Sequence, residues 1–170
     1  ILRSIAAFER TLTSPQTSYD RFVSGDRTAL SPQAERGLRL FTQIGCANCH
    51  SGPMFSDFEL HVLRVPDPPG STSHDAGDGA NRFRTPTLRN VTRTAPYMHG
   101  GVFATIPQVF QFYRQATTNP VDPDLRGVRT PTPQEAPDVE AFLRALGDAP
   151  FDASIPASVP SGLTPGGAPR

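Results

Sequence analysis

The most constraining feature of this chain is the run Cys46-Ala47-Asn48-Cys49-His50, which contains its only two cysteines. The Cys-x-x-Cys-His pattern is typical of covalent c-type haem attachment. Residues i, i+3 and i+4 share one face of a helical turn, so both thiols and the imidazole can meet one porphyrin edge. We therefore expect the thiols to bond the haem vinyl groups and the imidazole of His50 to bind the iron as its proximal ligand.

Two other kinds of site also use closely spaced cysteines. A redox-active dithiol is expected near a βαβ pattern, which the surrounding sequence lacks. A structural zinc site needs two further ligands at ordered spacing. The remaining histidines, His61, His74 and His99, form no second ligand pair. The sequence therefore favours haem, and we expect His61 and His74 to serve structure or surface rather than ligation.

Composition narrows the class of protein further. The 170 residues suffice for one domain with a hydrophobic core, and 16 basic residues balance 16 acidic ones. This balance gives no reason to expect a nucleic-acid or anionic-membrane partner. No apolar run approaches the length of a membrane span. The chain begins without methionine and shows no signal peptide, so we expect Ile1 to begin a mature, truncated or cleaved piece.

The 19 prolines and 14 glycines predict long irregular connections between few helices. We expect helices at 1–12, at 31–45, from Thr105 onward and at about 136–146, and little strand. Each has an apolar stripe: Ile1, Ile5, Phe8 and Leu12; Ala34, Leu38 and Phe41; Ile106, Phe110 and Tyr113; Val139, Phe142, Leu143 and Leu146. The expected fold is a mainly α, cytochrome c-like haem domain with long Pro/Gly-rich loops.

The second axial ligand of the iron decides the chemistry. A thioether stabilises ferrous iron and suits electron transfer, whereas an anionic phenolate stabilises ferric iron. Met98 lies in a loop well downstream of His50, and Tyr113 lies on the inward face of the third helix. Met54 is too close to His50 in sequence to cross the ring. Spacing alone does not rank Met98 against Tyr113.

Three segments together resemble the C-terminal haem domain of bacterial di-haem cytochrome c peroxidases and the related MauG-type enzymes. The segments are 45–52 (GCANCHSG), 83–91 (FRTPTLRNV) and 94–101 (TAPYMHGG), and the resemblance covers about residues 1–148. In that family the distal ligand lies on the helix after the Pro-Tyr-x-His-x-Gly loop. It is methionine in the ordinary peroxidases and tyrosine in MauG-type enzymes. The matching residue here is Tyr113, which the resemblance favours over Met98.

The resemblance also implies roles for loop residues. The backbone carbonyls of Thr94 and Pro96 match positions that hold a calcium ion between two haem domains, and calcium prefers oxygen ligands. His99 matches a recurring histidine near the domain interface, where it either tunes the haem environment or is structural. Arg84 and Arg89 could pair with haem propionates, because guanidinium binds carboxylates bidentately. The alternative for both arginines is a solvated surface charge.

Members of this family carry two haem motifs, whereas this chain carries one and contains no tryptophan. The resemblance implies an N-terminal domain, missing here, that holds a second haem c and cleaves hydrogen peroxide. Residues 1–30 would lead from that domain, 31–150 would form the present haem domain, and 151–170 a Pro/Gly-rich tail. The implied enzyme is periplasmic, stores oxidising equivalents and spends them on a partner protein, typically at tryptophan.

Two alternatives stay open. The first is an ordinary di-haem cytochrome c peroxidase, which reduces peroxide with electrons from a small redox protein and would favour Met98 as ligand. The second is a mono-haem electron-transfer cytochrome c with no catalysis.

Overall fold

The computed structural model describes residues 2–10, 16–118, 120–149 and 157–158. These residues belong to two compact units, one within 1–15 and 149–170 and the other spanning 16–148. The first unit contains helix α1 (Leu2–Glu9), which confirms a helix at this end. Ile5 and Phe8 of the predicted apolar stripe are exposed, as is Leu2 beside them. Leu12 and nearly all of the predicted 151–170 tail lie outside the described residues.

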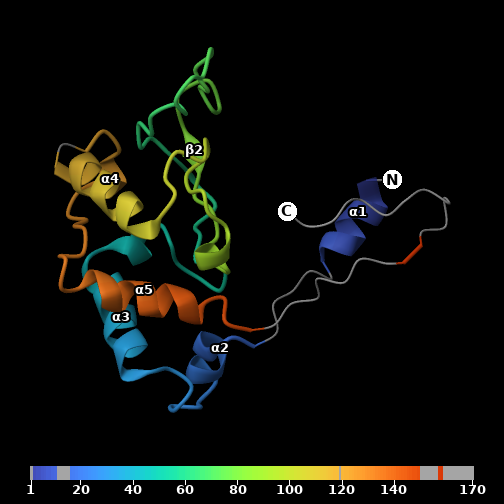
Figure 1. The fold of residues 1–170 in the computed structure, drawn as a ribbon, viewed down its shortest axis with the longest axis vertical. Helices are drawn as coiled ribbons and strands as arrows, with labels where there is room; N and C mark the ends of the chain where they lie inside the picture. Colours follow the sequence, from blue (N-terminus) through green and yellow to red (C-terminus); the bar gives the residue numbers. More distant parts are fainter. Residues whose placement is uncertain (1, 11–15, 119, 150–156, 159–170) are drawn as a thin grey trace. The chain divides into compact units, whose positions relative to one another are not determined.

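The second unit is mainly helical, as predicted (Figure 1). Its α-helices are α2 (Ser18–Val23), α3 (Pro32–Gln43), α4 (Ile106–Thr118) and α5 (Ala136–Ala145), and its 3₁₀ turns are η1 (Cys46–Asn48), η2 (Val91–Arg93) and η3 (Pro123–Leu125). The strands β1 (Leu60–His61) and β2 (Phe83–Arg84) pair antiparallel, with Leu60 opposite Arg84. Among the described residues, long loops make up most of the stretch between η1 and α4.

The ends of α3 and α4 follow from their capping residues. Ser31 accepts a hydrogen bond from the Ala34 N–H, which closes the start of α3 with proline in its first turn. Gly45 follows the end of α3 with φ of 90°, a left-handed conformation that glycine adopts without strain. At the start of α4, Thr105 and Gln108 exchange hydrogen bonds as a capping box. The serine cap, the glycine after α3 and the capping box of α4 are all signals that the sequence predicts correctly.

Helix α2 lies between the helices expected at 1–12 and 31–45, in a stretch where the sequence predicted no helix. Thr17 caps α2 by accepting from the Asp20 N–H, and the Asp20 carboxylate accepts from the Thr17 N–H in return. The same carboxylate receives the guanidinium of Arg89 at 2.7 Å. The helix has six residues and is held by a distant arginine, so its own sequence pattern is too short to reveal it.

The core lies where α3 packs against α5 (Figure 1). Gly37 permits the close approach of the two helices, because a Cβ there would clash with the backbone carbonyl of Asp138. The buried cluster confirms the predicted inward faces of α3 and α5 and adds Phe55, and its members are Phe41, Phe55, Val139, Phe142, Leu143 and Leu146. Cys46, Ile106 and Phe110 pack on the edge of this cluster. The core therefore connects the Cys-x-x-Cys-His run to α4.

Candidate haem-binding site

The Cys-x-x-Cys-His run forms a single helical turn directly after α3. Residues Cys46–Asn48 are the 3₁₀ turn η1, and the His50 N–H donates to the Cys46 carbonyl at 3.0 Å. The latter is the i to i+4 bond of an α-helix. This turn gives Cys46, Cys49 and His50 the common face that their spacing predicts.

The imidazole of His50 is oriented by the backbone that follows it. Its Nδ1 atom lies 3.0 Å from the carbonyl oxygen of Phe55, and with the proton on Nδ1 the imidazole donates to that oxygen. Burial lowers the pKa of His50, which favours the neutral ring. An imidazole held in this way keeps the Nε2 lone pair for a metal, an arrangement typical of histidine ligands.

Both cysteines are free thiols and partly buried. Burial raises the pKa of each thiol to about 11, and nearby acidic groups add to the effect at Cys49. Cys46 also packs against the hydrophobic core. Two neutral thiols beside an apolar cluster suit addition to the apolar vinyl edge of a porphyrin.

Tyr113 is partly buried on α4, the helix whose Ile106 and Phe110 pack against the hydrophobic cluster. Burial raises the pKa of its phenol, and the neighbouring Cys46 and Cys49 raise it further. Its ring makes an edge contact with Phe112, with ring centres 5.6 Å apart. Ile106 and Phe110 of α4 and Cys46 of the haem run thus pack against the same cluster, and the role of Tyr113 as an iron ligand stays a prediction.

The two methionines stand in different settings. Met98 is partly buried and has a left-handed backbone, with φ of 68°, in the loop between η2 and α4. Met54 is 44% exposed, and its carbonyl accepts from the Thr87 hydroxyl. Met54 is therefore an exposed loop residue.

Arg84 and Arg89 both bind protein groups. Arg89 forms a two-pronged ion pair with Asp20, with N–O distances of 2.7 and 2.9 Å, and also donates to the Pro53 carbonyl. Asp20 is a competing carboxylate that sequence reasoning missed, because it lies 69 residues away in an unpredicted helix. Arg84 is exposed and donates to the Phe58 carbonyl at 3.0 Å.

The loop residues singled out by the resemblance lie at the surface. Thr94 and Pro96 are exposed. His99 is also exposed, and its ring stacks on Phe83 with ring centres 3.6 Å apart and 6° between the planes. His74 bridges Asp67 and Asn81 within the exposed loop between β1 and β2. These positions leave His99 and the Thr94–Pro96 backbone accessible to another domain.

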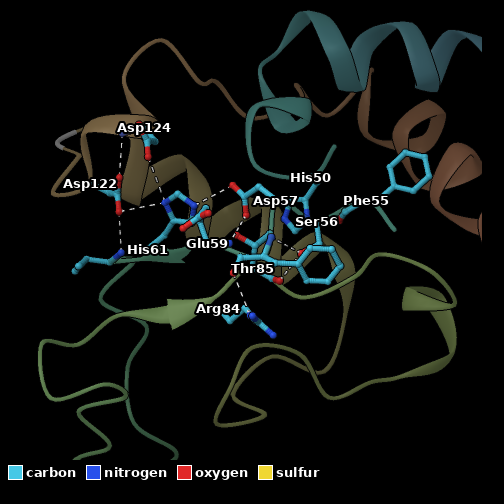
Figure 2. Close-up of polar contacts among 12 residues, drawn as sticks. His50, Phe55, Ser56, Asp57, Glu59, His61, Arg84, Thr85, Asp122 and Asp124 are labelled. Carbon is cyan, nitrogen blue, oxygen red and sulfur yellow. Dashed lines mark hydrogen bonds and ion pairs between the residues drawn. The ribbon is translucent and has the colours of Figure 1, made fainter. Parts of the chain in front are cut away.

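Sequence reasoning missed a polar group beside the haem run, shown in Figure 2. The Asp57 N–H donates to the Cys49 carbonyl at 2.8 Å, and the Asp57 carboxylate lies 3.1 Å from Nε2 of His61. On the other side of the His61 ring lie Asp122 and Asp124 (Figure 2). The spacing of four residues between Asp57 and His61 was a sequence signal for their contact. Nothing in the sequence indicated that Asp122 and Asp124, which follow α4, would lie beside His61.

The residues present fit a c-type haem. Two neutral thiols and an oriented neutral imidazole lie beside an apolar cluster against which Phe110 packs, and the partly buried phenol of Tyr113 is on the same helix as Phe110. A haem would use the thiols of Cys46 and Cys49 for attachment and the side chains of His50 and Tyr113 as axial ligands. The side chains thus fit the prosthetic group that the sequence motif predicts.

Curated relatives support the same class. The chain is 34% identical to the cytochrome-c peroxidase IdrP1 of Denitromonas iodatirespirans over 84% of this chain and 48% of that protein. It is 34% identical to the cytochrome c551 peroxidase of Nitrosomonas europaea, and 32% identical to the methylamine utilization protein MauG of Methylorubrum extorquens. These two alignments cover 95% and 92% of this chain, and 48% and 46% of the relatives. No family model matches the chain.

Solved structures with a similar fold belong to the same class of protein. A MauG-like protein associated with microbial copper homeostasis matches 84% of this chain and 55% of its own, with a TM-score of 0.66 and 26% identity. The di-haem peroxidase BthA of Burkholderia thailandensis matches 78% of this chain and 46% of its own, with a TM-score of 0.61 and 28% identity. The fold is therefore that of a cytochrome c-like domain in di-haem peroxidases.

The chain belongs to the family of di-haem cytochrome c peroxidases and MauG proteins, and it is homologous to a haem domain of that family. It spans about half the length of the curated relatives that it matches. Among the described residues, no helix has the length and hydropathy needed to cross a membrane.

Proposed function

We propose that this chain is the six-coordinate haem domain of a MauG-type, hydrogen-peroxide-dependent oxidoreductase. In this proposal Cys46 and Cys49 anchor the haem, His50 is the proximal ligand and Tyr113 is the distal ligand. The observation that carries the choice of MauG type is the place of Tyr113, partly buried on α4, the helix whose Ile106 and Phe110 pack against the same cluster as Cys46. The group held there would supply reversible one-electron redox chemistry.

The protein groups have separate tasks in this proposal. The Phe55 carbonyl keeps the His50 proton on Nδ1, so that the Nε2 lone pair would be available to a haem iron. The raised pKa of Tyr113 keeps its phenol protonated in the absence of a metal. As a ligand, the phenolate of Tyr113 would favour the ferric state. A domain ligated in this way is suited to holding oxidising equivalents rather than to rapid relay of electrons.

The rest of the proposal concerns the longer protein. A second haem c, in a domain outside this chain, would react with peroxide, and the oxidising equivalents would be spent on a partner protein at tryptophan. Thr94 and Pro96 are exposed, which supports the proposal that their carbonyls bind a calcium ion shared with that domain. His99 is also exposed and would lie at the same interface. Exposed Arg84 is the better placed of the two arginines for a propionate. The proposed location is the periplasm.

The competing function is that of a cytochrome c peroxidase. The curated relatives include such peroxidases and MauG proteins at similar identity, and Met98 is partly buried. A peroxidase would consume peroxide rapidly when supplied with a reduced small redox protein.

The discriminating experiment uses the longer, two-haem protein. Peroxide is added with and without a reduced small cytochrome, and cytochrome oxidation is followed by its absorbance. The proposal predicts a persistent oxidised protein that is little affected by the cytochrome, and Tyr113→Phe should abolish this persistence. Rapid cytochrome-dependent turnover that Tyr113→Phe leaves unchanged would instead establish the peroxidase.

A further inference from the structure

The group around His61 has the arrangement of a metal site. His61 is almost buried, with 11% of its side chain exposed, and it lies between carboxylates on both sides of its ring (Figure 2). Its Nδ1 atom lies 3.4 Å from Oδ2 of Asp122 and 3.5 Å from Oδ2 of Asp124. These separations exceed the 2.7–3.2 Å typical of an N–H···O hydrogen bond. Nδ1 therefore points between two carboxylates at more than hydrogen-bonding distance from either.

These separations suit coordination of a common ion. A tetrahedral zinc ion with bonds of about 2.0–2.1 Å keeps its ligand atoms about 3.3–3.4 Å apart. The two distances from Nδ1 come close to this value. The three ligand atoms of His61, Asp122 and Asp124 lie within 4.8 Å of one another. Small side-chain adjustments would place one ion at bonding distance from all three.

The other ring nitrogen supplies independent support. Nε2 of His61 lies 3.1 Å from Oδ2 of Asp57, and in the tautomer with the proton on Nε2 the ring donates to Asp57 and keeps the Nδ1 lone pair free. A carboxylate behind a histidine is the usual outer partner of a metal-bound imidazole. Oδ1 of Asp57 is fixed in turn by the Glu59 N–H at 3.0 Å. The orienting carboxylate is thus itself held in place.

Backbone donors also hold the carboxylate ligand Asp122. Its Oδ2 accepts from the Val62 N–H at 2.9 Å and its Oδ1 from the Asp124 N–H at 3.0 Å. Only 10% of the Asp122 side chain is exposed, whereas 65% of the Asp124 side chain is. The site therefore has a fixed, buried side and an open side through which an ion and a water ligand can enter.

We propose that His61, Asp122 and Asp124 bind a divalent transition-metal ion of the zinc class, with Asp57 orienting the imidazole. One imidazole and two carboxylates suit zinc better than calcium or magnesium, which prefer all-oxygen sites. This site is separate from the calcium position proposed at Thr94 and Pro96, and it does not rest on the proposed function.

A second triad of possible ligands shares His61 and needs a separate prediction. Cys49, Asp57 and His61 also lie within 4.8 Å of one another. Once Cys49 is bonded to haem, its sulfur is a thioether and no longer a thiolate ligand. An ion in the haem-loaded chain should therefore have only nitrogen and oxygen neighbours.

The test uses the haem-loaded chain, freed of other metals with a chelator and titrated with Zn²⁺ by calorimetry. We expect one tight site, a loss of about 100-fold or more in affinity in His61→Gln, and a loss of about 10–100-fold in Asp57→Asn, the range known for outer carboxylates. His74→Gln is the matched control, because His74 also lies between polar partners but is exposed and should leave zinc binding unchanged.

X-ray absorption of the zinc-loaded wild-type chain gives a second readout that needs no variant. The proposal predicts nitrogen and oxygen neighbours at about 2.0–2.1 Å with imidazole scattering. A sulfur neighbour at about 2.3 Å would overturn it in favour of Cys49. Absence of a 1:1 site, or affinity that survives His61→Gln but falls in His74→Gln, would also overturn it. Each variant is checked for an unchanged haem spectrum, so loss of folding is recognised directly.

Discussion

At the scale of single residues, the site depends on a few side chains whose surroundings prepare them for a metal-bound prosthetic group. His50 is kept neutral by burial and oriented by a backbone carbonyl. Cys46 and Cys49 are kept as neutral thiols, with pKa values of about 11. Tyr113 is kept as a phenol until a cation displaces its proton. Each property is local, so each can be tested by a single substitution.

The first prediction concerns covalent attachment. In the wild-type chain, acidified organic solvent should leave the haem with the polypeptide, because thioether bonds survive extraction. In the double variant Cys46→Ala and Cys49→Ala the haem should be extracted completely. Absorbance of the solvent phase measures the result. Extraction of haem from the wild-type protein would refute attachment through these cysteines.

At the scale of secondary-structure elements, α2 is held by the ion pair between Asp20 and Arg89 and by Tyr19, which packs on Phe55 and Phe142. The Asp20 carboxylate closes the capping box of α2 and receives Arg89, whose guanidinium also lies over the Tyr19 and Phe55 rings. Burial pushes the pKa of Asp20 up, but hydrogen bonds from Arg89 and Thr17 outweigh burial and lower it. A lowered pKa means that the ionised carboxylate stabilises the fold.

The second prediction is the pH dependence of this stabilisation. It should be present at pH values above about 3.9, the ordinary pKa of Asp, and be lost as the pH falls through the lowered folded-state value. Asp20→Asn should cost about 1–3 kcal/mol at neutral pH, with the difference from wild type vanishing in acid. Denaturant unfolding at several pH values measures this. A difference independent of pH would contradict the assignment, and Asp75→Asn in the exposed loop is the control.

The third prediction concerns the α3–α5 contact. Gly37→Ala should lower the free energy of unfolding by about 1–3 kcal/mol, because its Cβ would push against the Asp138 carbonyl and separate the two helices. Gln43→Ala, at the exposed end of α3, is the control and should change stability little. Chemical denaturation of the haem-loaded chain measures both. Equal stability of the two variants would show that the helices are not in close contact at Gly37.

At the scale of the whole molecule, this chain corresponds to about half of its curated relatives, so its function is proposed for a longer protein. The exposed His99 and the exposed Thr94–Pro96 backbone are the features that would face the other half. The fourth prediction is that removal of calcium from the two-haem protein lowers its peroxide-dependent activity. Added Ca²⁺ should restore the activity and Mg²⁺ should not. Unchanged activity after chelation would refute the calcium proposal.

Much of the fold was predictable because it follows from local signals. The serine cap at Ser31, the glycine after α3 and the apolar spacing of α5 determine where helices begin, end and pack, and each is a short-range property of the chain. The haem run is equally local, since its three functional residues share one turn. Tyr113 was predicted to face inward from helical spacing, although the family resemblance was needed to prefer it to Met98.

The remaining features depend on contacts between distant segments. Asp20 and Arg89 are paired across 69 residues, and neither the short helix α2 nor its partner carries a pattern that reveals the other. From the sequence, His61 was expected to be structural. Its proximity to Asp122 and Asp124 could not be predicted, because it depends on how the segment after α4 returns to β1. Such long-range charge pairs leave no periodic trace in a single sequence.

The central claim, that Tyr113 ligates the iron of a haem attached through Cys46 and Cys49, is tested most directly by near-infrared spectroscopy of the ferric, haem-loaded chain. The account predicts no methionine–iron charge-transfer band, a spectrum altered by Tyr113→Phe and a spectrum unchanged by Met98→Leu. A methionine–iron band that survives Tyr113→Phe and disappears in Met98→Leu would contradict it.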